Sequence, residues 1–444
     1  MISAIILAAG KGERMKTNIP KCAFPILKKP MINYIIDTLK KTKVDNRVIV
    51  VGHKKEVFLE LLPNETFSVQ EEQLGTADAV KSALDKIDSG ITIVLPGDTP
   101  LISSTLINKL IDIQIKENND MTLCTMMLDN PFGYGRIVRT NKKITQIVEE
   151  KDATAEEKRI KEVNTGIMVF DNAFLKKAIK KIKNDNAKGE YYLTDIVNFT
   201  KKISNYLLDN PDMLLGINDL YSLSVVEEKL EEDIKKKLLL SGVTIINKNT
   251  VTIGPDVEIE SGVTIYPNSF IMGKTKICKN SIIGPSSEIY NSIICENVLC
   301  RQSVVYDSTI SKDATVGPFA HIRMNTIIGE KDRIGNFVEV KNSILGVNTK
   351  SSHLSYLGDS EIGNNVNIGC GSITVNYDGK KKSKTIIGNN VFVGCNSNLI
   401  APITIKDDSF IAAGSTITLD VEESDLAIAR SKQINKKGYA KKYK

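Results

Sequence analysis

Potentially reactive side chains gather around one of the three histidines in this chain of 444 residues. His353 lies in the polar segment 351–356, and histidine is the side chain best suited to accept a proton near neutral pH. The polar residues expected near it are Arg323, Lys341, Asn367, Asn376, Tyr377 and Lys382. A base among positive charges indicates a phosphorylated substrate that must lose a proton. His53 and His321 lie next to apolar strand positions, and we interpret both as structural.

A second candidate site begins at the loop that follows the first apolar segment. Residues 7–15 read LAAGKGERM, and the glycines would let backbone N–H groups approach a polyphosphate at the start of a helix. Lys11, Arg14 and Lys21 add positive charge. The spacing is neither GxGxxG nor GxxxxGK[ST], which argues against Rossmann dinucleotide and P-loop sites. A glycine turn after a strand is also common loop geometry, so this segment alone leaves both interpretations open.

One carboxylate is expected beside that loop. Asp98 follows an apolar segment in PGDTP (96–100), and 73–77 read QLGTA, a candidate base- and sugar-reading loop. Ligands of open α/β sheets gather at the carboxyl ends of the strands. A carboxylate there predicts a Mg²⁺ site, because hard cations prefer oxygen ligands. A turn-capping aspartate is the alternative.

The elements that must position the second site form an α/β domain over residues 1–219. Short apolar segments alternate with helical ones, which is typical of a doubly wound sheet. The predicted buried strands are 3–7, 47–51, 92–95, 121–126 and 167–170. A linker helix is expected over 220–242, with Gly242 as its C-terminal cap. Its apolar stripe and its outer pairs are Val226, Leu230, Ile234 and Leu238, with Glu231–Lys235 and Glu232–Lys236.

The histidine lies in a half of the chain that has a period of six. Aliphatic residues recur at this spacing from 253 to 289, from 310 to 340, at 362 and 368, and from 387 to 417. Neither an α-helix nor a flat strand has that period, whereas a triangular coil of short parallel strands does. Residues 243–444 are therefore predicted to form a parallel β-helix of hexapeptide repeats with a basic tail. The rhythm breaks at 346–361 and 374–386, and we expect functional loops there.

Composition limits the possible classes of protein. The hydrophobic fraction of 41%, the charged fraction of 25% and the net charge of +6 are those of an ordinary soluble protein. The first apolar segment is too short to span a bilayer, and the lysine-rich tail is interpreted as a solvated end rather than a nucleic-acid site. Seven scattered cysteines without a CxxC pair indicate a reduced, cytoplasmic location.

The ordered motifs of the chain resemble those of the sugar-nucleotide pyrophosphorylases and, in detail, the bifunctional GlmU family. The motifs are LAAGKGERM at 7–15, PK at 20–21, QLGTA at 73–77, GDTPL at 97–101, GYGRI at 133–137, IVEEKD at 147–152, VNTGI at 163–167 and GEYYLTD at 189–195. The resemblance covers the whole chain. It implies a Rossmann-like nucleotidyltransferase domain, a linker helix and a left-handed β-helix that acetylates an amino sugar. The product would be UDP-N-acetylglucosamine, which feeds peptidoglycan synthesis.

In the N-terminal half, the resemblance implies Mg²⁺-dependent attack of N-acetylglucosamine 1-phosphate on UTP. Asp98 and Asn218 would hold the metal, while Arg14 and Lys21 would offset phosphate charge. The residues implied for UTP are Leu7, Ala8, Ala9, Gly10, Lys21, Gln70, Gly75 and Thr76. Those implied for the acetylated sugar are Gly135, Glu149 and Asn164.

In the C-terminal half, the resemblance implies acetyl transfer from acetyl-CoA to glucosamine 1-phosphate. His353 would be the base and Glu339 would orient its ring. Arg323, Lys341, Tyr356 and Asn367 would bind the sugar phosphate. The residues implied for acetyl-CoA and the transfer centre are Cys370, Asn376, Tyr377, Cys395, Ala413 and Arg430. A homotrimer with sites at its subunit seams is also implied.

Four positions depart from the pattern usual in the family. Cys395 stands in place of serine, Cys370 in place of a frequent alanine, Met324 in place of proline and Phe24 in place of histidine. Two alternatives remain: a nucleotidyltransferase whose β-helix is not catalytic, and a regulatory subunit without activity. Lys21, Asp98 and Asn218 argue against the regulatory subunit, and the residues around His353 argue against the silent β-helix.

Overall fold

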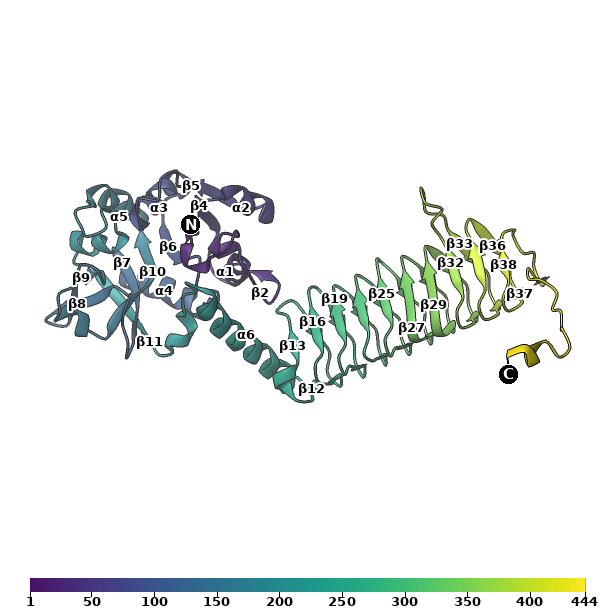
Figure 1. Cartoon of the computed structure of the whole chain (residues 1–444). Coiled ribbons are helices and arrows are strands. Elements are labelled where there is room, and N and C mark those ends of the chain that lie inside the picture. The colour runs from purple at the N-terminus through teal and green to yellow at the C-terminus, as the bar shows by residue number, and fades with distance from the viewer. Residues whose placement is uncertain (444) are drawn as a thin grey trace. The chain divides into compact units, whose positions relative to one another are not determined.

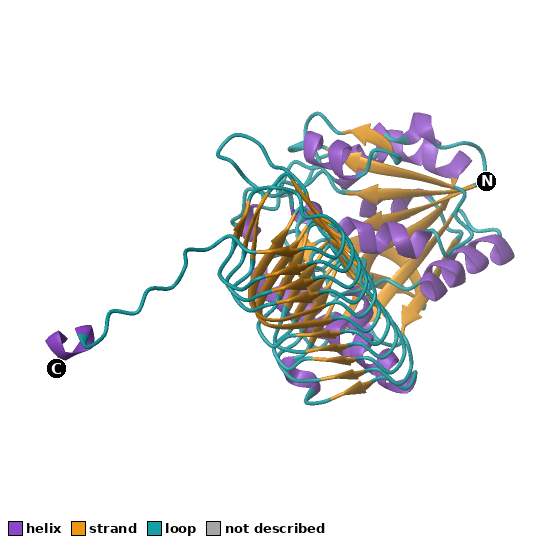
Figure 2. Ribbon diagram, turned by 90° about the vertical axis from the view of Figure 1, so that its right-hand side faces the viewer, coloured by secondary structure: helices purple, strands orange, loops and turns teal. Residues whose placement is uncertain are grey.

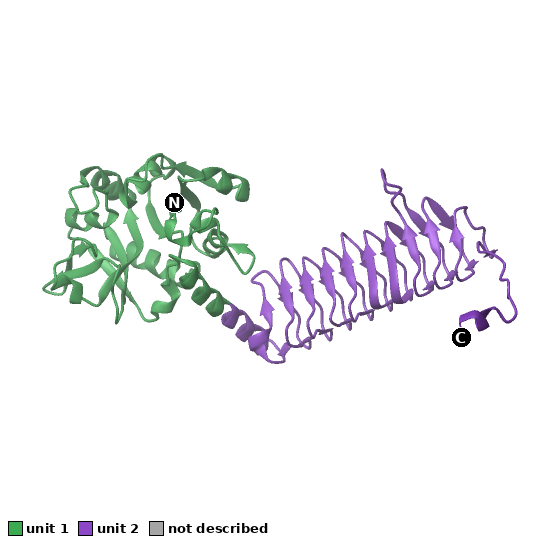
Figure 3. Cartoon of the chain, in the orientation of Figure 1, with its two compact units in different colours: residues 1–230 green, residues 231–444 purple. Residues whose placement is uncertain are grey.

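The computed structural model describes residues 1–443, and the chain divides into two compact units, Met1–Leu230 and Glu231–Lys444 (Figure 3). Each unit has a hydrophobic core of its own. Figure 1 shows the chain from its N-terminus to its C-terminus with the labels used below. Among the described residues, no helix is long and apolar enough to cross a membrane.

A nine-stranded sheet organises the first unit, and it confirms the five predicted strands. Its path is β11-β7-β10-β6-β1-β4-β5, and the β8–β9 hairpin joins it through β10. Pairing along the path is parallel except on both sides of β10. The strands are β1 (Ile2–Leu7), β4 (Asn46–Val51), β5 (Thr66–Val69), β6 (Ile91–Pro96), β7 (Met121–Met127), β8 (Arg136–Thr140), β9 (Lys143–Val148), β10 (Glu162–Asp171) and β11 (Ile203–Leu208).

Helices cover both faces of this sheet, as Figure 2 shows. Successive residues of β1 point to opposite faces, so that Ile5 enters one core cluster while Ala4 and Ile6 enter the other. This double burial explains why the central strands are continuous apolar runs. The helices are α1 (Met31–Leu39), α2 (Lys55–Leu61), α3 (Thr76–Ser82), α4 (Ser104–Glu117) and α5 (Asn172–Ala178).

The helix expected directly after the first loop is absent from the described residues, so that prediction is wrong. Only a 3-10 turn, Glu13–Met15, follows Gly12. A second turn (Lys21–Ala23) and the short hairpin of β2 (Pro25–Ile26) and β3 (Lys29–Pro30) come before α1. An anion bound at this loop would therefore be stabilised by side-chain cations and loop N–H groups rather than by a helix dipole.

Helix α6 (Leu220–Leu240) confirms the predicted linker helix and contributes to both cores. Val226 is buried in the first unit, whereas Ile234 and Leu238 pack against the core of the second. The predicted pair of Glu231 and Lys235 is present at 2.7 Å. Glu232 pairs with Lys248 at 2.6 Å rather than with Lys236 as predicted. Gly242 follows with a φ of 93°, as a C-terminal cap requires.

The second unit is a left-handed parallel β-helix, which confirms the hexapeptide prediction. Each turn places one aliphatic side chain per strand in a continuous core. One nine-stranded sheet contains β14 (Glu258–Ile259), β17 (Lys276–Ile277), β20 (Ile293–Ile294), β23 (Thr309–Ile310), β26 (Ile327–Ile328), β28 (Ile344–Leu345), β30 (Ser360–Ile362), β33 (Thr385–Ile387) and β36 (Ile403–Ile405).

The other two faces of the coil belong to one sheet of nineteen strands. Its strands are β12 (Thr244–Ile245), β13 (Thr252–Ile253), β15 (Thr264–Ile265), β16 (Phe270–Met272), β18 (Ile282–Ile283), β19 (Glu288–Tyr290), β21 (Leu299–Cys300), β22 (Val304–Tyr306), β24 (Thr315–Val316), β25 (His321–Arg323), β27 (Arg333–Lys341), β29 (Lys350–Gly358), β31 (Asn367–Ile368), β32 (Ile373–Val375), β34 (Phe392–Val393), β35 (Asn398–Ile400), β37 (Phe410–Ile411), β38 (Thr416–Ile417) and β39 (Leu426–Ala427).

Only one of the two predicted loops leaves the coil. The prediction for 346–361 is wrong, because β29 and β30 occupy most of that segment. The other break is a real insertion: Ile362 pairs with Ile387, 25 residues on, whereas Ile387 pairs with Ile405, 18 residues on. The inserted loop is closed by a bridge between Tyr377 and Lys382.

Candidate functional site

The first unit contains a cavity of about 760 Å³ at the carboxyl ends of β1 and β6. It collects residues from the phosphate loop, the QLGTA loop and the later motifs. Of the predicted residues, Ala8 does not line it. The predicted residues that do are Leu7, Ala9, Gly10, Arg14, Lys21, Gln70, Gly75, Thr76, Asp98, Gly135, Glu149, Asn164 and Asn218.

Lys21 is the polar centre of this cavity. Its ammonium group forms an ion pair with Asp98 and donates to the amide oxygen of Asn218 at 3.3 Å. Arg14 donates to the same amide oxygen at 2.8 Å. The backbone N–H of Ile217 donates to the carbonyl of Asp98 at 3.0 Å, which holds the two predicted metal ligands together. Two oxygen donors thus face a cation, and oxygen is the ligand type that Mg²⁺ prefers.

The buried side-chain amide of Gln70 fixes the QLGTA loop. Gln70 is 4% exposed and donates to the carbonyl of Gly75 at 3.1 Å and to Asp78 at 2.8 Å. Gly75 has a φ of +121°, and a Cβ built there would lie 2.5 Å from the carbonyl oxygen of Tyr191. Glycine is therefore required for this loop to lie against the segment at Tyr191.

In another part of the cavity wall, Glu149 and Asn164 lie next to Gly135. Asn164 donates its N–H to the carbonyl of Gly135 at 2.8 Å, and Thr194 donates to Glu149 at 3.0 Å. Burial raises the pKa of Glu149 above its usual range, although the bond from Thr194 opposes this. The carboxyl oxygens of Glu149 can accept hydrogen bonds from sugar hydroxyls.

A largely buried ion pair that was not predicted from the sequence supports this side of the cavity. Arg136 is 2% exposed, donates to the carbonyl of Tyr134 and pairs with Glu150 at 2.6 Å. Glu150 also accepts the N–H of Gly133 at 3.1 Å. The sequence feature that could have indicated this pair is the arginine within GYGRI, because a charge on a buried strand needs an acidic partner.

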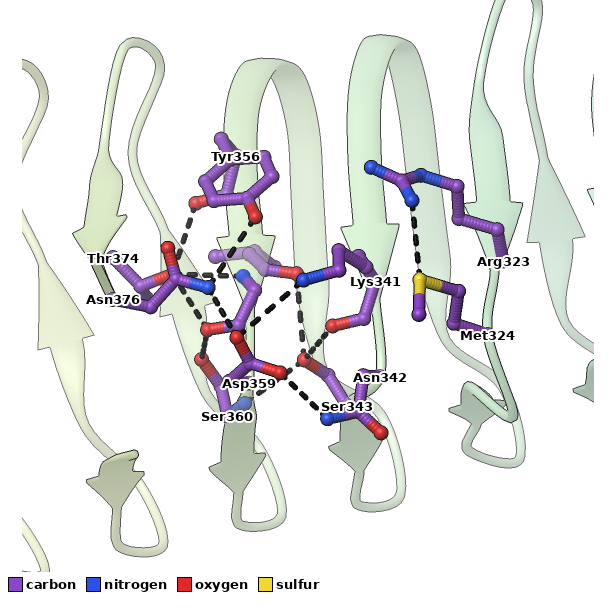
Figure 4. Close-up of polar contacts among 12 residues, drawn as sticks. Arg323, Met324, Lys341, Asn342, Ser343, Tyr356, Asp359, Ser360, Thr374 and Asn376 are labelled. Atoms are coloured by element: carbon purple, nitrogen blue, oxygen red, sulfur yellow. Dashed lines mark hydrogen bonds and ion pairs between the residues drawn. The ribbon is translucent and has the colours of Figure 1, made fainter. Parts of the chain in front are cut away.

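In the β-helix, several predicted residues meet around an aspartate that was also missed (Figure 4). Asp359 pairs with Lys341 at 3.5 Å, and both side chains are about nine-tenths buried. It accepts from Asn342 at 2.6 Å and from Asn376, which also reaches the hydroxyl of Tyr356 at 3.4 Å. Burial would raise the pKa of Asp359, but these bonds and the ammonium outweigh it and lower the pKa. The feature that could have indicated this site is an acidic residue, Asp359, at a corner of the coil where the backbone has a positive φ.

Arg323 and Glu339 form a second pair on this face. The guanidinium contacts the carboxylate at 2.7 and 2.8 Å. Parallel pairing places Arg323 beside Lys341 and Glu339 beside Tyr356. These residues therefore share one face of the coil.

His353 lies on the neighbouring face, before the corner at Leu354. Its Nδ1 lies 2.8 Å from the side-chain oxygen of Asn336, the residue that opposes it in register. No hydrogen bond among the described residues joins its ring to Glu339, Arg323 or Lys341. A groove of about 360 Å³ reaches the imidazole. The contact with Asn336 was not predicted, because nothing in the surrounding segment (NFVE, 336–339) indicates it.

The residues implied for acetyl-CoA form a column on the face of His353. Backbone bonds of 2.8 Å link the carbonyl of Cys370 to the turn of Cys395, and that of Cys395 to the turn of Ala413. Arg430 donates to the carbonyl of Ala413 at 2.8 Å. Tyr377 belongs to the inserted loop, where its hydroxyl donates to Gly379 at 2.7 Å. The predicted acetyl-transfer residues thus occupy two faces of one chain.

Comparisons with known proteins match both units. The nucleotidyl transferase family matches residues 3–209, and the bacterial transferase hexapeptide repeats match residues 256–291 and 384–418. The bifunctional protein GlmU of Acholeplasma laidlawii is 52% identical over 99% of this chain and 97% of its own length. The proteins of the same name from Exiguobacterium sp. (45% identical, 99% of both chains) and Brevibacillus brevis (44% identical, 99% and 97%) are also similar.

A crystal structure of a putative glucose-1-phosphate thymidylyltransferase from Bacillus anthracis matches 52% of this chain and 95% of its own. Its TM-score is 0.43 and its sequence is 20% identical, a likeness too weak to show a shared activity.

Proposed function

The chain belongs to the bifunctional GlmU family, and from this premise we propose that it makes UDP-N-acetylglucosamine in two reactions. It is a bifunctional transferase with a nucleotidyl transferase unit and a hexapeptide-repeat unit. The β-helix would acetylate glucosamine 1-phosphate with acetyl-CoA. The first unit would join the product to UTP and release pyrophosphate. The observation that carries the proposal is the pairing of a cation-lined cavity in one unit with a histidine-containing groove in the other.

Uridylyl transfer needs an oxygen of the sugar phosphate to attack the α-phosphorus of UTP. Both reactants are anions, so charge neutralisation and positioning dominate catalysis. Arg14 and Lys21 would offset the phosphate charges. Glu149 and Asn164 would hold the acetylated sugar. No side-chain nucleophile is required, since the sugar phosphate itself forms the new bond and pyrophosphate leaves.

Asp98 and Asn218 would hold a Mg²⁺ ion. Their oxygens already face the ammonium of Lys21, so the donor set fits a hard cation. Among residues 1–443, no group of three or more acidic, histidine or cysteine side chains is placed to hold a metal ion. The other ligands would be phosphate oxygens and water. When bound, the ion neutralises phosphate charge. Lys21 must then turn toward the phosphates, because both cations use the same oxygens.

Acetyl transfer needs the amine of the sugar to lose a proton. If Nδ1 of His353 donates to the oxygen of Asn336, Nε2 keeps its lone pair and can accept that proton. The amine then attacks the thioester carbonyl, the C–S bond breaks and CoA leaves as the thiolate. Cys370, Cys395, Ala413 and Arg430 would contact acetyl-CoA, and Asn376 and Tyr377 would line the transfer centre.

A homotrimer would unite the two faces of the β-helix. Within one chain, Glu339 contacts Arg323 and the ring of His353 contacts Asn336. The proposed contact between Glu339 and an imidazole would therefore involve a neighbouring copy. Ile327 and Ile344 are at least 40% exposed on successive turns of the nine-stranded sheet, and Ile386 is 40% exposed two turns beyond Ile344, a surface suited to burial between copies. Seven free cysteines favour the cytoplasm, and the product would supply cell-wall synthesis.

The test follows thiol release from acetyl-CoA with glucosamine 1-phosphate, and pyrophosphate release from UTP with the acetylated product. Wild type should show both activities. His353→Ala should lose acetyl transfer by at least about a hundredfold and keep uridylyl transfer, whereas Asp98→Asn should do the reverse. No thiol release by wild type would sink the two-reaction proposal. A His353→Ala variant with wild-type acetyl transfer would remove only the role of His353.

A further inference from the structure

The predicted metal ligand Asn218 lies at the start of the long helix α6. This helix begins at Leu220, and Asp219 is its N-cap, because the N–H of Leu223 donates to the carbonyl of Asp219 at 3.0 Å. Asn218 therefore comes directly before the N-cap of a helix of 21 residues. The position of its amide oxygen depends on how firmly this junction is held.

Ser222 contacts the junction from within the first turn of the helix. Its N–H donates to the carboxylate of Asp219 at 2.8 Å, and the N–H of Asp219 donates back to the hydroxyl of Ser222 at 3.0 Å. These reciprocal bonds have the pattern of a capping box, which stabilises the start of a helix. Such a box alone indicates nothing about a ligand.

The hydroxyl of Ser222 also accepts a bond that a capping box does not need. The N–H of Asn218, one residue before the N-cap, donates to it at 2.9 Å. The hydroxyl donates its own proton to Asp219, whose carboxylate and carbonyl oxygens lie 2.8 and 2.9 Å away. One hydroxyl thus holds the N–H groups of two successive residues, and a third bond fixes its orientation.

The backbone is held on the other side of Asn218 as well. The N–H of Ile217, a fully buried residue, donates to the carbonyl of Asp98 at 3.0 Å. Three successive N–H groups are therefore bound, one by the backbone of the other predicted metal ligand and two by Ser222. The position of Asn218 relative to Asp98 thus depends on Ser222 at one end.

We propose that Ser222 is a positioning residue for the metal site, holding Asn218 where its amide oxygen and the carboxylate of Asp98 can bind one Mg²⁺ ion. This ion demands near-ideal octahedral geometry, so a displaced ligand lowers its affinity. Ser222 would act through the backbone of Asn218, as residues behind metal ligands commonly do. The inference rests on the Mg²⁺ site of the uridylyl transfer proposed above.

The experiment measures metal binding by the full-length protein without turnover. Mn²⁺ is titrated in the presence of saturating UDP-N-acetylglucosamine, and the electron paramagnetic resonance signal of the free ion gives the dissociation constant. Ser222→Ala should raise this constant about tenfold, because two N–H groups lose their acceptor. The Mg²⁺ concentration for half-maximal uridylyl transfer should rise similarly, while acetyl transfer stays within about twofold of wild type.

Ser224 provides the matched control. It lies two residues further along the same helix, and its hydroxyl donates to the carbonyl of Tyr221 at 2.8 Å. Ser224→Ala should leave the dissociation constant for Mn²⁺ unchanged. Ser222→Thr retains the hydroxyl and should stay within about threefold of wild type. Asp98→Asn should remove most of the measured binding, which assigns that binding to this site.

A double-mutant cycle separates positioning from a general effect on stability. Asn218→Ala removes the ligand itself. In that background Ser222→Ala should weaken Mn²⁺ binding no further, because it acts through Asn218. A further loss as large as in wild type would show that Ser222 acts by another route, and would refute the inference.

A dissociation constant within about twofold of wild type in Ser222→Ala would also overturn the inference, even if the variant unfolds at a lower temperature. Ser222 would then be a helix cap alone. Wild type that binds no Mn²⁺ and needs no divalent metal for uridylyl transfer would refute the proposed metal site itself. The two failures are therefore distinguishable.

Discussion

At the scale of single residues, two ion pairs compensate charges that lie largely buried. Lys341 and Asp359 neutralise each other, as do Arg136 and Glu150. Asp332 is different: it is 1% exposed and has no cationic partner among the described residues. Its oxygens accept the N–H groups of Gly329 and Thr349, each at 2.7 Å. Burial raises its pKa to about 7, although these two bonds oppose the shift.

This shift predicts that the β-helix loses stability as the pH rises. The folded pKa of Asp332 lies above the unfolded value of about 4, so its contribution is fully present below pH 4 and is lost as the pH rises through 7. Between pH 5 and pH 8 the free energy of unfolding should fall by about 3 kcal/mol from this group. Denaturant unfolding followed by circular dichroism would measure it.

Asp332→Asn provides the comparison. The amide keeps one acceptor oxygen but cannot accept both N–H groups equally well, so the variant should be about 1–3 kcal/mol less stable at pH 5. Its stability should then vary less with pH than that of wild type. Parallel pH curves for the two proteins would contradict a raised pKa at this residue.

At the scale of elements, the period of the apolar residues was enough to predict the β-helix. Every aliphatic side chain at the six-residue spacing enters the core, so the pattern indicates the fold directly. Loops are harder to infer, because a turn can be one residue shorter while the chain stays within the coil. Ile334 pairs with Ser351, 17 residues on, and this shortening looked like a loop. The polar contacts of His353 and Lys341 depend on register between turns, which the sequence does not display.

The exposure of Cys370 and Cys395, the proposed acetyl-CoA contacts, predicts that acetyl transfer is sensitive to thiol reagents. Cys395 is exposed and Cys370 partly so, whereas Cys22, beside Lys21 in the other site, is buried. Burial raises the pKa of Cys22 to about 12, so it forms almost no reactive thiolate. Treatment with N-ethylmaleimide should therefore depress acetyl transfer several-fold while uridylyl transfer stays within about twofold.

The variant Cys395→Ser tests which thiol is responsible. It should retain acetyl transfer and lose much of its sensitivity to the reagent, because serine keeps a small donor at that position. Equal loss of both activities in wild type, or no loss, would count against this placement of the thiols.

At the scale of the whole molecule, the candidate sites of the two units are proposed to depend differently on assembly. The cavity of the first unit is lined entirely by residues of that unit. The residues proposed for acetyl transfer instead divide between two faces of the coil, with His353 on one and Arg323 on the other. If the proposed trimer joins unlike faces of neighbouring copies, a complete site needs one face from each of two copies.

This division predicts complementation between two inactive variants. His353→Ala and Arg323→Gln should each have little acetyl transfer alone. Co-expressed in equal amounts, they should form mixed trimers in which about a quarter of the seams carry both intact faces. Acetyl transfer should then recover to about a quarter of the wild-type rate, measured as thiol release and normalised to uridylyl transfer, which neither change touches. Recovery should vanish when the separately purified variants are mixed without subunit exchange. If the co-expressed protein is no more active than the better single variant, each site must lie within one chain.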